Sequence, residues 1–472
     1  MFSTALPRGI ACTLVAAFTA ALAACTPSGS DEPQAALEHT QFFSPQETPA
    51  LITLASSMLP KEHKPSAVLV AQQDRAVAAA AQAIAEGMPL LVDPTPEDAQ
   101  ALAAELGVSL ETYSENTGQT TNQPDPDPDP LTVTPSFRQE QDFAVLATPE
   151  TPLEQLASVR ALGLDVEVVN DPRESQRVMA NPEAPALVLT DQAQGTFAQA
   201  LALAGAGEVP GGGGVVFPGR RMVALYGHPS GPALGVLGEQ GPQEAVQRVQ
   251  ELVEQYKDAA PEEHILPAFE IIATVATAGA GPDGDYSNET AVEDLRPYVD
   301  AIGRAGGYAI LDLQPGQARF LDQAKRYEEL LALPHVGLAL DPEWRIQPHE
   351  KPMQRIGSVD AAEVNEVATW LADFTKEHNL PQKVLVVHQF QLGMLERREA
   401  IDTSRPELAW VLHADGHGNP GDKLGTWDTL RQDLQPGFFL AWKNFIDEDT
   451  PTFSPAQTYS EVTPRPWFVS YQ

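Results

Sequence analysis

The chain has 472 residues, of which 43% are hydrophobic, and this is enough to build more than one packed core. It carries 65 acidic and 29 basic residues, giving a formal net charge of −36. Because this charge repels phosphate groups, we expect no nucleic-acid partner.

Residues 1–25 have the features of a secretion signal. Arg8 is the only charged residue among them, and the apolar run from Gly9 to Ala24 is too short to favour spanning a membrane. The run ends in Leu22-Ala-Ala-Cys25, which resembles the lipobox of bacterial lipoproteins. The resemblance implies that Cys25 becomes a lipidated N-terminus, bearing acyl chains such as palmitate. The protein would then be anchored to the extracytoplasmic face of the cell membrane, as a cell-envelope lipoprotein of the actinobacterial type.

Cysteine content limits the chemistry of the mature chain. The only two cysteines are Cys12, inside the signal, and Cys25. If Cys12 is removed with the signal and Cys25 carries lipid, the mature chain has no free thiol. Disulfides, thiolate metal sites and cysteine nucleophiles are then excluded.

After Cys25, residues 26–49 are rich in Pro, Ser, Gly and acidic side chains without apolar periodicity, and they predict a flexible tether. Residues 50–205 then alternate short apolar strands with alanine-rich helices, which predicts an α/β domain with a parallel sheet. The predicted strands are 67–71, 89–93, 143–147, 166–169 and 186–190, and the predicted helices are 75–86, 96–106, 152–162, 173–180 and 194–204.

Two stretches interrupt this alternation. Residues 124–130 read Pro-Asp-Pro-Asp-Pro-Asp-Pro, which fits neither a helix nor a central strand and predicts a stiff exposed loop. Residues 206–220 contain the run Gly211-Gly-Gly-Gly214 and predict a linker between domains.

Part of the predicted α/β domain resembles a known repeat. Ser66-Ala-Val-Leu-Val-Ala71, the helix over 76–84 and Gly87-Met-Pro-Leu-Leu-Val92 are similar to putative cell-wall-binding repeats of Gram-positive surface proteins. The usual Phe-Pro-Asp-Ala phrase of that family is missing. The resemblance implies a possible role in binding the cell wall, and the alternative is an α/β domain without a ligand of its own.

Residues 221–472 contain a second, longer series of strands and helices. Eight βα units over about 250 residues predict a (β/α)8 barrel of the TIM type. The predicted strands are 222–226, 266–272, 308–313, 336–340, 383–387, 408–412, 437–442 and 467–471, and the main predicted helices are 243–257, 292–304, 318–331, 361–378 and 426–434.

Polar residues follow nearly every one of these apolar strands. Barrel enzymes place their catalytic groups at the carboxyl ends of the strands, so this pattern predicts a functional site, although buried ion pairs also occur there as structure. The residues at the strand ends are His228, Glu270, Asp312, Gln314, Asp341, Glu343, His388, His413, Asp415, Lys443, Asn444 and Tyr471.

The carboxyl groups in this set are the candidate catalytic residues. Paired carboxyls divide acid and base work when one stays protonated and the other ionised. The candidates are Glu343, Asp341, Asp415 and Glu270, and Asp341-Pro-Glu343 with Trp344 resembles the Asp-x-Glu motif of muramidase-type and chitinase-type glycoside hydrolases. That resemblance implies that Glu343 protonates the glycosidic oxygen, Asp341 orients the reacting group and Trp344 stacks on sugar, although Pro342 departs from the usual motif.

The remaining residues predict how a cell-wall glycan would be held. The candidate substrate-binding residues are Asp312, Trp344, His388, His413, Lys443, Asn444 and Tyr471. No cofactor is predicted. Two alternatives stay open: a barrel that binds envelope polysaccharide without cleaving it, and a metal-dependent hydrolase using His388, His413, Asp415, Glu270 and Asp312.

Overall fold

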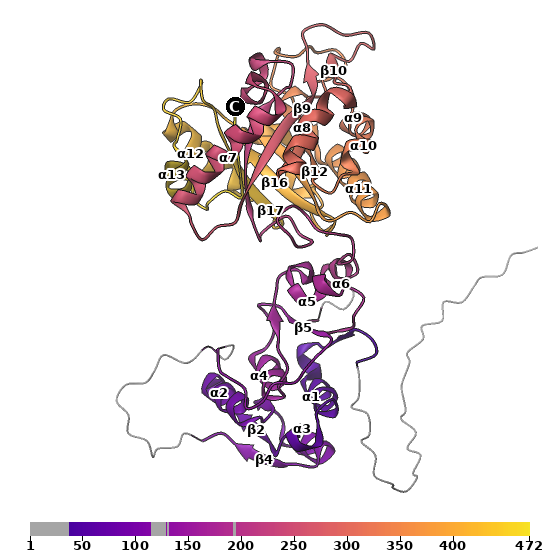
Figure 1. Cartoon of the computed structure of the whole chain (residues 1–472), viewed down its shortest axis with the longest axis vertical. Helices are drawn as coiled ribbons and strands as arrows, with labels where there is room; N and C mark the ends of the chain where they lie inside the picture. The colour runs from indigo at the N-terminus through magenta and orange to yellow at the C-terminus, as the bar shows by residue number, and fades with distance from the viewer. Residues whose placement is uncertain (1–36, 115–128, 130–131, 192–194) are drawn as a thin grey trace, which may run out of the picture.

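The computed structural model describes residues 37–114, 129, 132–191 and 195–472 (Figure 1). The predicted signal and the lipidation site at Cys25 lie outside these residues. The predicted loop 124–130 also lies outside them, except for Asp129. Among the residues that the structure describes, no helix has the length and apolar character needed to cross a membrane.

Seven short strands of the N-terminal part form two parallel sheets. The first sheet has the order β1 (Gln41–Phe42), β7 (Ala186–Leu189), β5 (Ala144–Ala147) and β6 (Glu167–Val168). The second has the order β3 (Leu90–Val92), β2 (Ala67–Ala71) and β4 (Ser109–Thr112). The prediction of parallel strands in this region is therefore confirmed.

The helices between these strands begin and end at the expected kinds of residue. They are α1 (Thr48–Ser57), α2 (Ala76–Glu86), α3 (Pro96–Leu106), α4 (Leu153–Ala161), α5 (Gln176–Ala180) and α6 (Thr196–Leu201). In α3, the hydroxyl of Thr95 accepts a hydrogen bond from the amide of Asp98, Pro96 occupies the first turn, and Gly107 ends the helix at φ +69°.

Secondary structure lies inside the segment that the sequence predicts to be a tether. Strand β1 and the start of α1 fall inside residues 26–49, which were expected to form a tether. Phe43 is buried and its amide donates to the carbonyl of Val188 at 2.8 Å. Strand β1 has only two residues, too few to show a periodic pattern in the sequence. Strand β4 was also not predicted, because all of its residues are exposed and it has no buried face.

Eight parallel strands of the C-terminal part close into a barrel. In order around the barrel they are β8 (Arg221–Gly227), β9 (Ile265–Ala276), β11 (Tyr308–Leu313), β12 (Val336–Leu340), β14 (Lys383–Gln389), β16 (Leu408–Ala414), β17 (Phe438–Asn444) and β18 (Phe468–Tyr471). Strand β18 pairs with β8 through Phe468 and Met222, and β8 pairs with β9, which closes the ring. The predicted TIM-type barrel and all eight of its strands are confirmed.

Helices cover the outside of the barrel. They are α7 (Pro242–Ala259), α8 (Val292–Arg304), α9 (Phe320–Arg326), α10 (Glu328–Leu331), α11 (Ala361–Glu377), α12 (Pro420–Arg431) and α13 (Pro455–Glu461). The predicted helix 318–331 is divided at Tyr327. The predicted helix 426–434 begins earlier, because Asn419 caps it and Pro420 fits its first position.

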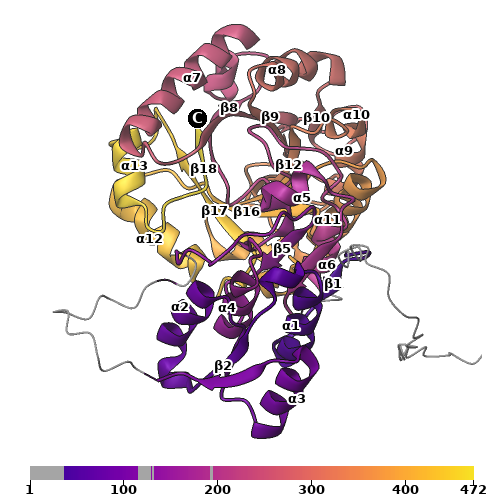
Figure 2. The same ribbon diagram turned by 60° about the horizontal axis from the view of Figure 1, so that its bottom comes forward.

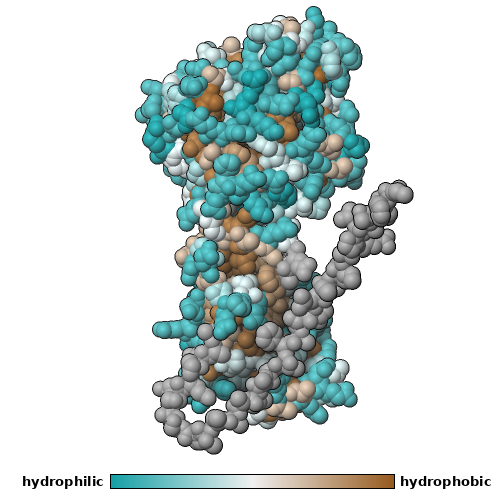
Figure 3. All heavy atoms as spheres, turned by 90° about the vertical axis from the view of Figure 1, so that its right-hand side faces the viewer, coloured by the Kyte–Doolittle hydropathy of each residue, from teal (hydrophilic) through white to brown (hydrophobic). Residues whose placement is uncertain are grey.

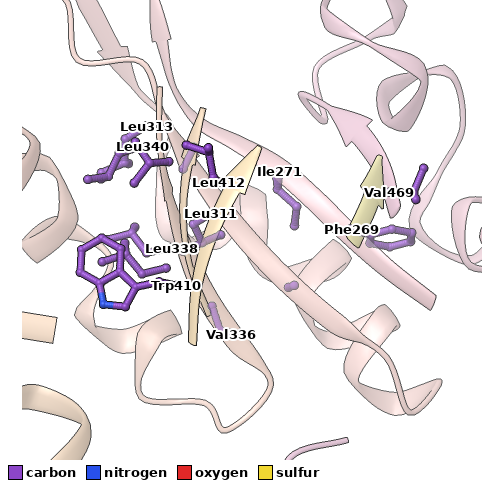
Figure 4. Packing of buried hydrophobic residues seen from close by; sticks show 14 of the residues in the cluster. Phe269, Ile271, Leu311, Leu313, Val336, Leu338, Leu340, Trp410, Leu412 and Val469 are labelled. Carbon is purple, nitrogen blue, oxygen red and sulfur yellow. The ribbon is translucent and has the colours of Figure 1, made fainter. Parts of the chain in front are cut away.

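Side chains alternate between the inside and the outside of the barrel wall. Outward residues such as Leu311, Leu338 and Trp410 pack beneath the helices (Figure 4). Inward residues are smaller on several strands, for example Ala224, Ala339 and Ala409, and they form a separate core inside the ring.

The predicted linker 206–220 forms part of the barrel core. Val209, Val216 and Phe217 pack with the inward residues, and the amide of Val216 donates to the side chain of Gln382 at 2.9 Å. Three glycines, Gly211 to Gly213, have φ values of +86°, +90° and +78°, so this turn needs residues without a side chain. The segment closes the amino-terminal end of the barrel, which glycine content alone did not reveal.

The N-terminal part contacts this same closed end. The guanidinium of Arg173 donates to the carbonyl of Pro406, just before β16, at 2.7 Å. Figures 1 and 2 show the indigo and magenta strands on one side of the barrel. The carboxyl ends of the barrel strands therefore face away from the N-terminal part. In the view of Figure 3 the barrel surface is largely hydrophilic, whereas hydrophobic residues gather on the N-terminal part next to it.

Replacing Phe217 by alanine tests the closure of the barrel. The ring packs on Phe439 and Trp467 with centroid distances of 5.1 and 6.1 Å. Losing it should lower the free energy of unfolding of the barrel by about 3 kcal/mol, measured by urea denaturation. Leu392→Ala, at a side chain that is 46% exposed, is the control and should cost less than about 0.5 kcal/mol. An equally small effect at Phe217 would contradict a packed closure.

Candidate functional site

A cavity of about 380 Å³ opens at the carboxyl ends of the barrel strands. Its polar lining comes from several strands and the loops that follow them. The lining includes Tyr226, Gln314, Asp341, Glu343, Trp344, Asp415, His417, Lys443, Phe445 and Gln472. The volume suits one or two sugar-sized rings more than a large folded partner.

Strand alternation brings the ionisable groups together beneath this cavity. Glu270 on β9, Asp312 on β11, His388 on β14 and His413 on β16 all belong to the inward rows of the barrel and have no exposed surface. Register places His388 beside His413 on the neighbouring strand. Each of these four strands thus carries a polar inward residue above an apolar interior.

His388 lies at the centre of the cluster. Its Nε2 atom lies 2.9 Å from Glu270 Oε1 and 3.9 Å from Asp312 Oδ1. Its Nδ1 atom makes a short hydrogen bond of 2.5 Å with Asp415 Oδ2. One imidazole therefore joins carboxylates from two sides of the barrel.

Lys443 and Tyr226 form the second connection across the barrel. The Lys443 ammonium lies 3.5 Å from Asp415 Oδ2 and 3.4 Å from the centre of the Tyr226 ring. The Tyr226 hydroxyl donates to Asp312 Oδ2 at 2.8 Å. The cation is thus held between a carboxylate and an aromatic face, both buried, where each attraction is stronger than in water.

Two carboxyls in the cluster are held ionised. Burial alone would raise the pKa of Asp415, but the charges of Lys443 and His388 bring it down to about 2. Burial would likewise raise the pKa of Glu270, and the two histidines lower it below its ordinary value. For His388, burial opposes the charged form, and the charges of Glu270, Asp312 and Asp415 raise its pKa well above the ordinary value.

Three other carboxyls are pushed toward the protonated form. Burial, with the negative charge of Asp415, raises the pKa of Glu343 to about 7. Burial raises the pKa of Asp312 to about 6 and that of Asp341 well above its ordinary value. Near neutral pH the cavity therefore holds an ionised carboxylate, Asp415, and a carboxyl that still carries a proton, Glu343, which are the requirements of acid and base catalysis.

The local backbone around Glu343 forms a turn. Strand β12 ends at Leu340, as predicted, Asp341 caps a turn over Pro342–Trp344, and the amide of Glu343 donates to Asp341 Oδ1 at 3.2 Å. Asp341 and Glu343 therefore lie just after the strand and not on it. Pro342 suits the first position of this turn, and both carboxyls still line the cavity.

Two predicted substrate-binding residues and one further strand-end residue lie apart from the cluster. Asn444 and Tyr471 occupy outward positions, where the Asn444 amide donates to Thr458 at 3.1 Å and the Tyr471 hydroxyl bonds that of Tyr256 at 2.6 Å. They join the barrel wall to α13 and α7. His228 bonds Ser230 and Thr290 outside the cluster. The remaining predicted residues gather in or directly beneath the cavity.

Ser470, Gln472 and His417 belong to the site region and were not predicted. The Ser470 hydroxyl lies 3.1 Å from His413 Nε2, and Gln472 and His417 line the cavity. Ser470 shares the inward face of β18 with Phe468, so alternation from Phe468 would have selected it in place of Tyr471. His417 follows β16 in a loop, where no periodicity applies.

Two groups of these residues have the composition of a metal site. Glu270, His388 and His413 form one, and Asp341, His388 and Asp415 form the other, each with ligand atoms within 4.8 Å of one another. An exposed acidic group, Asp283, Asp285 and Glu289, has the same spacing on the surface.

Comparisons with protein-family models and with curated proteins find no match to this chain.

The pKa of Glu343 predicts a dependence of stability on pH. A folded pKa of about 7, against the ordinary 4.5, means that the folded state keeps a proton that the unfolded state has lost, so stability falls as pH rises from 4.5 through 7. Glu343→Gln cannot ionise and should lack this loss. In urea denaturation the variant should gain on the order of 1–3 kcal/mol relative to the wild type between about pH 4 and pH 8. A constant difference across that range would contradict the raised pKa.

Proposed function

We propose that the barrel is a glycoside hydrolase acting on a glycan of the cell envelope. The proposal depends on one observation: Glu343 and Asp415 line the same cavity, beside the indole of Trp344. The pKa of Glu343 is raised to about 7, whereas Asp415 is ionised. Glu343 would protonate the leaving oxygen, and Asp415 would stabilise the positive charge that develops on the sugar or activate water. Trp344 and Phe445 would stack on the sugar faces.

We also propose that the chain works at the membrane as a lipid-anchored protein, with its N-terminal sheets forming an α/β domain that contacts wall polymer. The support is the sequence Leu22-Ala-Ala-Cys25 and the position of the N-terminal part at the closed end of the barrel. In this arrangement the cavity opens away from the part of the chain nearest the anchor, so a polymer can reach it.

Replacing Glu343 by glutamine tests the catalytic role. With purified peptidoglycan or arabinogalactan fragments as substrates, the variant should lose about 10²- to 10⁴-fold in kcat, because it can no longer donate a proton. Its affinity for the fragments, measured by calorimetry, should change little. Trp344→Ala is the matched variant and should weaken binding more than it lowers kcat.

Two results would count against this role. Full activity of Glu343→Gln on a verified substrate would show that another group supplies the proton. Binding of fragments by the wild type without any turnover across about pH 4 to 8 would favour a barrel that only binds glycan.

Cys25→Ala tests the anchor. The wild type should partition into detergent and be found with the membrane, whereas the variant should be released or remain unprocessed at the size of the full chain. The measurement is fractionation followed by mass spectrometry of the N-terminal peptide. Identical partition and size for both proteins would contradict lipidation at Cys25.

A further inference from the structure

Three buried polar atoms beneath the cavity have no hydrogen-bond partner among the described residues. They are Glu270 Oε2, Asp312 Oδ1 and His413 Nδ1. All three side chains have no exposed surface, and leaving a polar atom without a partner in such a place is unfavourable. Three such atoms around His388 Nε2 require an explanation beyond chance packing.

The three atoms approach one another around His388. His413 Nδ1 lies 3.6 Å from Glu270 Oε1, which is too far for a hydrogen bond, and Asp312 Oδ1 lies 3.9 Å from His388 Nε2. One hydrogen on His388 Nε2 bonds Glu270 Oε1 at 2.9 Å and leaves all three atoms unsatisfied. A single cation bound between Glu270 and the two histidines would satisfy Glu270 Oε2 and His413 Nδ1, and its positive charge would lie on the side of His388 that Asp312 approaches.

The far sides of both histidines are already fixed. His388 Nδ1 bonds the carboxylate of Asp415, and His413 Nε2 bonds the hydroxyl of Ser470. Each ring therefore directs its other nitrogen toward Glu270. Histidine ligands of metal ions are held in this way, by a carboxylate or another polar group on the nitrogen that does not bind the metal.

The charge of the cluster is compatible with a cation here. Four carboxyl groups, those of Glu270, Asp312, Asp341 and Asp415, are buried in the cluster, and Lys443 is the permanent cation that contacts it. Burying charges of one sign without compensation is strongly unfavourable. A divalent ion bound between Glu270 and the two histidines takes the place of the proton on His388 as the positive charge that faces Glu270.

We propose that Glu270, His388 and His413 bind one Zn²⁺ ion beneath the cavity. Two imidazole nitrogens and a carboxylate suit Zn²⁺, whereas Ca²⁺ and Mg²⁺ prefer oxygen ligands alone. Because the three side chains that bind it are fully buried, the ion has a structural and electrostatic role. It ties β9, β14 and β16 together and, through His388, orients Asp415. The site does not depend on the chain cleaving glycan.

Metal content of the full-length protein tests the site without any substrate. Purified in detergent and analysed by mass spectrometry, the protein should contain about one equivalent of Zn²⁺. Removal by a chelator should lower Tm, and Zn²⁺ alone should restore it. Replacement by Co²⁺ should produce the visible absorption of a four-coordinate site. Substoichiometric metal with no Zn²⁺-dependent change in Tm would overturn the proposal.

Variants locate the ion. Glu270→Gln should abolish the bound equivalent, whereas Asp283→Asn, in the exposed acidic group, should retain it. If Glu270→Gln does not fold, Ser470→Ala is the milder variant, because it removes only the support of His413 and should weaken Zn²⁺ affinity about 10- to 100-fold. Ser460→Ala, on the surface of α13, is its control. Unchanged affinity in Ser470→Ala, or one equivalent retained by Glu270→Gln, would place the ion elsewhere and overturn the proposal.

Discussion

The burial of several carboxyl groups around one histidine is the constraint on which the site depends. His388 lies between Glu270 and Asp415, and it cannot move without breaking hydrogen bonds to two sides of the barrel. Lys443 offsets part of the negative charge and is itself fixed against Tyr226. Because the groups are shielded from water, each strongly determines the protonation of the others. The division into ionised and protonated carboxyls follows from this packing.

The barrel supplies the rigidity that such a cluster requires. Glu270, Asp312, His388, His413 and Lys443 stand on inward positions of strands that are paired on both sides, and the outward positions are packed under helices. The amino-terminal end is closed by Val209, Val216 and Phe217, and the cavity opens at the opposite, carboxyl end of the strands. Functional groups on strands of this kind are held more firmly than groups on loops.

Much of this arrangement could be predicted from the sequence. Apolar strands with polar ends predicted the barrel and most of the residues that gather at the carboxyl ends of its strands. The prediction of site residues failed where the two-residue alternation of a strand was misread by one position. Tyr471 was chosen at the end of β18, although Ser470 is the inward residue, and Asn444 was chosen beside the inward Lys443.

Other features depend on contacts that no local pattern records. The glycine-rich segment 206–220 resembles a linker, but its apolar residues reach the barrel interior. Strand β1 has only two residues, and it is a strand because it pairs with the edge of β7. The pKa values of Glu343 and Asp415 could not be predicted from the sequence either, because they depend on which charged groups meet across the barrel.

The most direct test of this account is the titration of Glu343 in the folded protein. Carbon-13 NMR of the glutamate carboxyls, with the Glu343 signal identified by its loss in Glu343→Gln, reports the protonation of this one group. The account predicts an apparent pKa of about 7. A midpoint near the ordinary 4.5 would show that Glu343 is ionised at neutral pH and would contradict its role as the proton donor.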